Sequence, residues 1–274
     1  MEFMRMIDRR RVRDSFGKRA CEYENHASVQ KRVLTRFLEL LKRECAAPGS
    51  LLDVGSGTGM LLRSLRGMYG DVRAVGVDLA MGMSRKARES LKTDGRTHIL
   101  TADAEHLPFP DSLFDLVVST STFQWLSEPD RAFSEALRVL VPGGLFCFTL
   151  FGEKTLHELR SSYRSALAEQ GRVADDRTHT FLSREEVKSA LEQAGFTGCR
   201  VSSRTELDVH ENVPALLRSL KSIGAGSASP ATLRGLSGKR IMLDMMQRYK
   251  TEYGNESGVP ATYEIIFGVG RKAL

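Results

Sequence analysis

Cysteine is scarce in this chain of 274 residues, and the four that occur lie far apart. None of them forms a C-x-x-C pair, which argues against a zinc site and against a disulfide framework. Long apolar runs are missing too, because no stretch reaches the ~18 residues that a transmembrane helix needs. The N-terminal segment is charged and lacks the apolar stretch of a secretory signal. We therefore expect a cytoplasmic protein that holds no metal.

Positive charge is concentrated at one end of the chain. The formal net charge is +6, and residues 1–43 hold twelve Lys or Arg against six Asp or Glu, whereas the remainder is balanced. We expect residues 1–48 to form a basic helical arm. This arm is either a solvated surface or a docking face for an acidic partner. Nucleic acid is disfavoured as that partner because no basic reader motif with interleaved aromatics occurs, and no membrane partner is expected.

Short apolar runs alternate with helical patterns over the first 151 residues. Apolar residues first recur at helical spacing over 29–45. Strand-like runs follow at 50–54, 72–77, 98–101, 114–119 and 145–151, with helical patterns between them at 60–68, 83–92 and 129–140. The turn Pro142-Gly143-Gly144 is expected to start the fifth strand. This alternation predicts an α/β fold with a doubly wound, mostly parallel sheet.

The regular alternation of strand and helix patterns ends after residue 151. Helices are predicted over 153–170, 183–194, 214–223 and 230–249, and strands over 199–207 and 263–269. The two helices inserted before the closing strand exceed what a minimal doubly wound sheet requires. We interpret residues 212–258 as a helical cap over the substrate site, mounted on a core formed by residues 49–211 and 259–274.

Three glycines stand at alternate positions where the first strand should give way to a helix. The segment LLDVGSGTGMLL at 51–62 contains Gly55, Gly57 and Gly59. Glycine there lets the chain turn tightly and lets a ligand approach the backbone. Asp78 follows at the end of the second strand, where a carboxylate binds ribose hydroxyls. Met60 stands where a nicotinamide fold requires a small residue, which disfavours that cofactor.

The D-x-G-x-G-x-G pattern resembles motif I of the class I S-adenosylmethionine-dependent methyltransferases, and residues 15–151 resemble that superfamily. The resemblance implies a seven-stranded Rossmann-like sheet that binds S-adenosylmethionine and releases S-adenosylhomocysteine. It also implies that Asp53 faces the methionine end, while Asp103 and the Ala104 backbone hold the adenine. Further cofactor-binding positions are expected at Tyr23, Leu79, Ser119 and Thr120.

A narrower resemblance covers nearly the whole chain. It rests on VRDSFG at 12–17, TFQWL at 122–126, RSLKSIGA at 218–225 and PATYE at 260–264. These segments resemble the malonyl-acyl-carrier-protein O-methyltransferases of biotin synthesis, with Ser222 where that family's cap segment has glycine. The resemblance implies an acidic, malonylated carrier protein as substrate. The implied substrate-binding residues are Tyr23, Gln124, Trp125, Arg218 and Lys221, of which the last two would bind the free carboxylate.

A malonyl carboxylate is already ionised at neutral pH, so methyl transfer to it needs no general base. The histidines show no metal spacing and are assigned no catalytic role. The protein would align the acceptor oxygen with the methyl group and exclude water. Two alternatives stay open. One is a methyltransferase of the same fold that acts on another small carboxylic acid or a quinone precursor. The other is a methyltransferase-like assembly factor that binds cofactor and a protein partner without methyl transfer.

Overall fold

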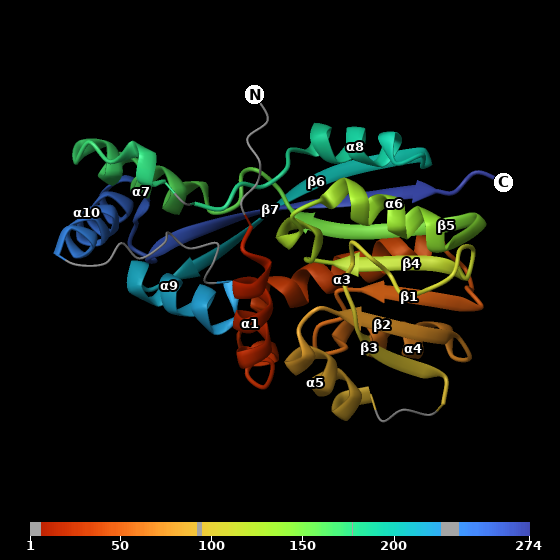
Figure 1. Ribbon diagram of the computed structural model, residues 1–274. Helices are drawn as coiled ribbons and strands as arrows, with labels where there is room; N and C mark the ends of the chain where they lie inside the picture. The colour runs from red at the N-terminus through yellow and green to blue at the C-terminus, as the bar shows by residue number, and fades with distance from the viewer. Residues whose placement is uncertain (1–6, 92–94, 177, 226–235) are drawn as a thin grey trace.

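The computed structural model describes residues 7–91, 95–176, 178–225 and 236–274 (Figure 1). Its centre is a seven-stranded sheet in the order β3-β2-β1-β4-β5-β7-β6. The strands are β1 Ser50–Val54, β2 Arg73–Asp78, β3 Thr97–Thr101, β4 Phe114–Thr120, β5 Leu140–Phe151, β6 Thr197–His210 and β7 Val259–Arg271. Strands β1 to β5 are parallel, and β7 runs antiparallel to both β5 and β6. The predicted doubly wound, mostly parallel sheet is confirmed.

Helices cover both faces of this sheet. One face packs against α3 Ser28–Glu44, α4 Met60–Tyr69 and α5 Met81–Leu91, and the other against α6 Pro129–Val139 and α8 Arg184–Gln193. Successive strand residues point to opposite faces, so Val118 joins the first core and its neighbour Val117 joins the second. A strand buried on both faces reads as a continuous apolar run, which explains the strand signals in the sequence.

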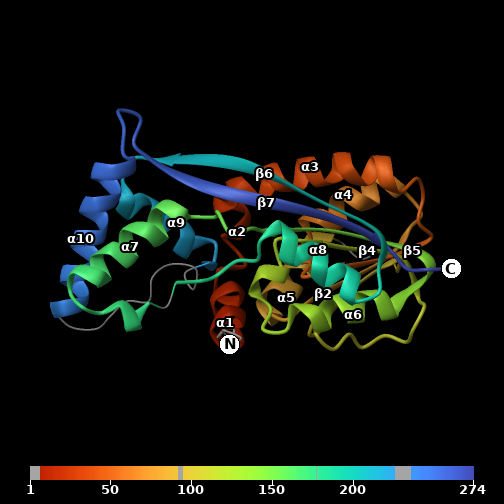
Figure 2. The same cartoon turned by 90° about the horizontal axis from the view of Figure 1, so that it is seen from above.

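A third core lies beyond the carboxyl ends of the parallel strands (Figures 1 and 2). It contains the helices α7 His157–Glu169, α9 Val213–Ser222 and α10 Leu236–Tyr253. The long antiparallel pair of β6 and β7 extends from the sheet to these helices, and α9 and α10 are inserted between its two strands. Tyr249 of α10 is fully buried, and its hydroxyl donates to the carbonyl oxygen of Pro260 at 2.6 Å.

Two short helices near the N-terminus, α1 Arg9–Arg19 and α2 Tyr23–His26, lie between this third core and the sheet (Figure 2). The carboxylate of Asp8 caps α1 by accepting from the amide of Arg11 at 3.0 Å. The buried Ala20 and half-buried Phe16 pack against Ala80 and Met83 at the start of α5. Among the described residues, none of the helices combines the length and apolarity needed to span a bilayer.

The helix predicted over 153–170 begins only at His157. The backbone amides before it donate to β7 instead of starting a helix: Gly152 donates to the carbonyl of Glu264 at 2.8 Å, and Leu156 to that of Thr262 at 2.6 Å. Leu156 then adopts a φ of 51° just before α7. Tertiary hydrogen bonds to β7 therefore override the helical pattern of the first four residues.

The segment Pro142-Gly143-Gly144 lies inside β5, so its prediction as a turn before that strand is wrong. Pairing with β4 continues on both sides of it, with a register shift after Phe114. Gly143 accommodates the irregularity with a φ of 76°, and its amide donates to the carbonyl of Lys272 at 3.1 Å. Residues 230–235 of the helix predicted over 230–249 lie outside the described residues.

The glycine at position 268 tests how tightly the sheet packs. A Cβ there would lie 2.2 Å from the Phe148 ring across the β5–β7 pair, so Gly268→Ala should lower the free energy of unfolding by about 1–3 kcal/mol. Gly67→Ala is the matched control, because this exposed glycine of α4 has open space around it and should gain about 0.5–1 kcal/mol. Urea denaturation measures both, and equal midpoints for the two variants would contradict the packing.

Candidate cofactor and acceptor site

The turn from β1 into α4 is built from the three predicted glycines. Gly55, Gly57 and Gly59 have φ values of 78°, 54° and 84°, a region that favours glycine. The amide of Gly55 donates to the carbonyl of Val77 at 2.8 Å, which joins the turn to the end of β2. A Cβ on Gly55 would lie 2.0 Å from the Thr122 hydroxyl. The turn can therefore form only with glycine at 55.

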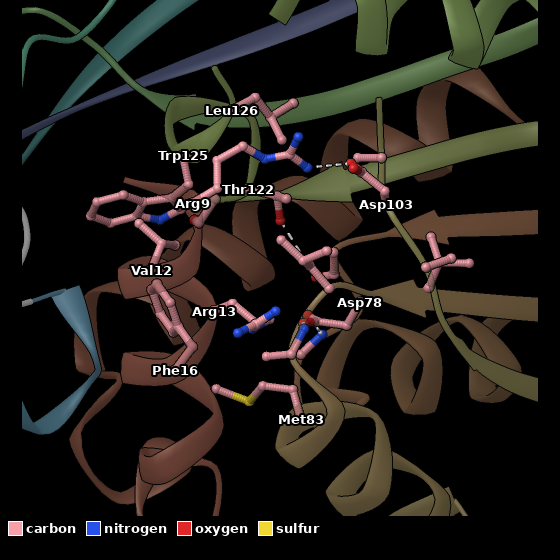
Figure 3. A pocket seen from close by; sticks show the side chains of 18 of the residues that line it. Arg9, Val12, Arg13, Phe16, Asp78, Met83, Asp103, Thr122, Trp125 and Leu126 are labelled. Carbon is pink, nitrogen blue, oxygen red and sulfur yellow. Dashed lines mark hydrogen bonds and ion pairs between the residues drawn. The ribbon is translucent and has the colours of Figure 1, made fainter. Parts of the chain in front are cut away.

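A cavity opens above this turn, at the carboxyl ends of β1 to β4 (Figure 3). We call it the first cavity. Nine residues predicted from sequence line it, namely Tyr23, Gly55, Gly57, Asp78, Leu79, Asp103, Ala104, Thr120 and Trp125. They come from α2, the glycine turn, and the ends of three strands. The carboxyl end of an open α/β sheet is where such folds bind their ligands.

Asp78 is held at the floor of the first cavity by two backbone amides. Its carboxylate accepts from Gly57 at 2.9 Å and from Ala80 at 2.8 Å. Burial raises the pKa of Asp78 to about 6, although both amide hydrogen bonds oppose that change. A ligand with two hydroxyl donors would satisfy the remaining acceptor capacity of this carboxylate, and the ribose of the predicted cofactor supplies such a pair.

Asp53 lies beneath the cavity instead of in its lining. Its side chain is 1% exposed, and neither carboxylate oxygen has a hydrogen-bond partner within the described part of the chain. Burial and the nearby charge of Asp78 raise its pKa well above the usual value. A buried acid without partners needs a donor. The methionine ammonium of S-adenosylmethionine fits that need, so the residues present fit this cofactor.

Asp103 is paired with Arg9, a residue that the sequence placed in the basic arm as part of a solvated or docking surface and not at the cavity. Arg9 of α1 donates from one guanidinium nitrogen to Asp103 and from another to Glu105. Burial favours the neutral acid, yet the hydrogen bond and charge of Arg9 hold the pKa of Asp103 below its usual value. Glu105 is 2% exposed and also accepts from the amides of Ser127 and Glu128. Arg9 thus holds α1 across the side of the cavity that Asp103 lines (Figure 3).

Other parts of α1 complete the wall of the first cavity. Val12, Arg13 and Phe16 line it, and the Phe16 ring meets Trp125 edge-on with centroids 5.6 Å apart. The hydroxyl of Ser15 donates to the carbonyl of Gly224 at 2.9 Å, which joins α1 to the end of α9. The VRDSFG segment and the charge of the basic arm were the sequence signals for these residues, and they placed Arg13 on a possible docking face and gave Val12, Ser15 and Phe16 no role.

A second cavity adjoins the first. It is lined by α2, the end of β5, the end of α9 and β7, and the residues Phe16, Tyr23, Ser121 and Trp125 line both cavities. Gln124 lines the second cavity only. Its amide nitrogen donates to the carbonyl of Ser121 at 2.7 Å, and its amide oxygen accepts from Phe151 at 3.4 Å. Ser121 itself has a φ of 54°, so Gln124 supports a left-handed loop.

Four other predicted residues line neither cavity. Gly59 packs beneath the turn, where a Cβ would lie 3.0 Å from Leu91. Ser119 is buried and donates to the carbonyl of Val54 at 2.7 Å. Arg218 and Lys221 share one face of α9, as predicted, but both side chains are exposed on the outside of the molecule. The structure therefore does not bring this pair to the place where the two cavities meet.

Protonation of Asp78 should weaken cofactor binding. The carboxyl is protonated in the free protein below a pH of about 6, and the predicted contact with ribose hydroxyls needs it as an acceptor. Affinity for S-adenosylmethionine should fall toward about tenfold per pH unit below that value and be flat above it. Calorimetry between pH 5 and 8 measures this affinity. The control is Asp78→Asn, which should bind weakly and show no loss of affinity below pH 6. An affinity that does not change over the range would contradict the assignment.

Loss of the Arg9 ion pairs should release α1 from the cavity. Arg9→Met keeps the length of the side chain but removes two charge-assisted hydrogen bonds, each worth about 1.5–3 kcal/mol. We expect S-adenosylmethionine to dissociate about tenfold faster or more, measured by stopped-flow displacement. Arg10→Met is the matched control on the exposed side of α1 and should dissociate at the wild-type rate. Equal rates for both variants would show that α1 does not retain the ligand.

Known proteins resemble the chain in both sequence and fold. Residues 52–148 match the family model described as a methyltransferase domain. The malonyl-[acyl-carrier protein] O-methyltransferase of Geobacter sulfurreducens is 51% identical over 97% of this chain and 100% of its own. A biotin biosynthesis bifunctional protein of Teredinibacter turnerae is 34% identical over 97% of this chain and 47% of its own. A solved methyltransferase structure from Bacillus halodurans shares the fold, with a TM-score of 0.62, 18% identity, and coverage of 88% of this chain and 99% of that one. The chain therefore belongs to the malonyl-[acyl-carrier protein] O-methyltransferase family.

Proposed function

We propose that the protein transfers the methyl group of S-adenosylmethionine to the free carboxylate of a malonyl group on an acyl carrier protein. The product is the methyl ester that primes pimeloyl synthesis for biotin. The proposal rests chiefly on the 51% identity, along nearly the whole of both chains, to a relative named for this methyl transfer. The relative named for biotin biosynthesis supports the pathway.

In this proposal the three predicted parts of the chain have separate tasks. The core of residues 49–211 and 259–274 binds the methyl donor, with Asp78 at the ribose, Asp103 and Ala104 at the adenine, and Asp53 at the methionine end. The arm of residues 1–48 and the cap of residues 212–258 enclose the acceptor. The contact of Ser15 with Gly224 supports this division, because it joins arm and cap beside the second cavity.

The residues at the boundary of the two cavities promote methyl transfer by enclosing the reacting groups. S-adenosylmethionine supplies a methyl group activated by its positive sulfur. Phe16 and Trp125 close the boundary with apolar rings, which excludes water from the acceptor carboxylate and raises its reactivity. The acceptor is already ionised, so no side chain needs to remove a proton from it. The exposed histidines His26, His106 and His157 are accordingly left without a role.

The exposed basic residues suit an acidic carrier protein. Arg218 and Lys221 lie on the outer face of α9, whose end is joined to α1. Exposed cations also line the outer side of α1, at Arg10, Arg11 and Lys18. We assign Arg218 and Lys221 to substrate binding through this docking surface. Such charges speed encounter and favour an acidic partner.

Transfer of labelled methyl groups from S-adenosylmethionine tests the acceptor. Malonyl-carrier protein should accept the label, and malonyl-coenzyme A should accept it with a kcat/KM about tenfold lower or more, because it lacks the docking contacts. Acetyl-carrier protein is the matched control and should accept none, since it has no carboxylate.

Two outcomes would contradict the proposal. Transfer to a free carboxylic acid or a quinone precursor, but to no malonyl thioester, would identify another methyltransferase of this fold. Calorimetric binding of S-adenosylmethionine without transfer to any of these acceptors would indicate an assembly factor.

A further inference from the structure

The boundary between the two cavities carries two hydroxyl groups. Tyr23 and Ser121 line both cavities, which places these two residues where a methyl donor in the first would meet an acceptor in the second. Within the described part of the chain, no hydrogen bond is formed by the Tyr23 hydroxyl or the Ser121 hydroxyl. Burial, with the charges of Asp78 and Glu24, raises the pKa of Tyr23 far above its usual value, so its hydroxyl remains a donor.

The described residues on the acceptor side of this boundary include no cation in the cavity lining. Of the residues that the structure describes, no Lys, Arg or His lines the second cavity. The two arginines of the first cavity are already paired, Arg9 with Asp103 and Glu105, and Arg13 with Asp14 at 2.9 Å. Arg160 lies 5.7 Å from the ring centroid of the lining residue Phe181 but is not itself part of the lining.

The backbone conformation of Ser121 is a second observation that supports a functional role for its hydroxyl. Its φ of 54° is a conformation that favours glycine, and few other residues adopt it without cost. The loop is held there on both sides: the Ser121 amide donates to Thr149 at 2.9 Å, and its carbonyl accepts from Gln124 at 2.7 Å. Ser112 and Leu156 also have a positive φ, but of these three residues Ser121 alone lines both cavities, and this placement supports a use for its hydroxyl.

We infer that the hydroxyls of Tyr23 and Ser121 bind the free carboxylate of the acceptor, so that it is read by neutral donors and not by a cation. This inference rests on the proposed function. One carboxylate oxygen accepts both hydrogen bonds and the other forms the bond to the methyl carbon. The carbon–sulfur bond breaks, and its electron pair goes to sulfur. No proton is transferred, so both hydroxyls keep theirs.

Neutral donors suit this reaction for an electrostatic reason. A cation paired with the carboxylate would stabilise its negative charge in the ground state, and that charge is lost as the ester forms. It would also lie close to the positive sulfur of the donor, where like charges repel. Neutral hydroxyl donors orient the carboxylate oxygen, but they stabilise its ground-state charge less than a cation would and do not repel the positive sulfur. Gln124 acts here as a positioning residue, because it holds the loop that presents Ser121.

Binding of carrier proteins to the full-length protein without cofactor tests the inference. Calorimetry with malonyl-carrier protein and acetyl-carrier protein isolates the carboxylate, the one group by which they differ. The wild type should bind the malonyl form at least a hundredfold more tightly. Ser121→Gly should lose about tenfold of this preference, and Ser121→Gly combined with Tyr23→Phe should abolish it, because each hydrogen bond to a charged group is worth about one to two powers of ten.

Controls separate this role from folding and docking. Ser121→Gly should melt at or above the wild-type temperature, because glycine is favoured at its φ. Arg218→Ala should weaken both carrier proteins equally, and Arg160→Met should leave the preference intact. The inference is overturned if Ser121→Gly keeps the full preference, or if either arginine variant removes it. A wild type that does not prefer the malonyl form would instead overturn the proposed acceptor, and the inference with it.

Discussion

The site depends on the close approach of two chain segments at the carboxyl ends of β1 and β4. Gly55 passes so near Thr122 that a side chain on it would meet the threonine hydroxyl at 2.0 Å. On its other side the turn is joined to the end of β2 by the hydrogen bond from the Gly55 amide to the carbonyl of Val77, and there the amide of Gly57 fixes the carboxylate of Asp78. The floor of the first cavity, with the carboxylate that we predict to bind ribose, therefore depends on the glycine turn between β2 and Thr122.

A second constraint is the charge buried at Glu105. A carboxylate that is 2% exposed requires strong hydrogen-bond donors, and the amides of Ser127 and Glu128 supply two of them. Arg9 supplies the opposite charge, and it lies on α1. The ion pair of Arg9 with the buried Glu105 therefore positions the N-terminal arm against the core. This explains how a helix far away in sequence becomes a wall of the first cavity.

The positions of Arg218 and Lys221 show what helical spacing in a sequence cannot predict. A spacing of three residues correctly placed both cations on one face of a helix. It did not reveal which way that face turns, because burial of Leu216 and Leu220 decides the rotation of α9. Those leucines fill the third core, so the charged face points outward to where a carrier protein can dock. The acceptor carboxylate is then left to groups inside the cavity, and the nearest candidates are hydroxyls.

By itself the sequence determined the fold class, the positions of the first five strands along the chain and the glycine turn after the first strand, because these depend on local signals. Apolar runs mark strands buried on both faces, and glycines with an acid at the next strand end mark the cofactor loop. Only the tertiary structure decided the roles of Arg9 and Ser121, since one acts through partners 94 and 96 residues away and the other through a backbone dihedral. Likewise, the start of α7 and the path of β5 were set by hydrogen bonds to β7 and by pairing with β4. Such contacts join segments distant along the chain, and no local pattern encodes them.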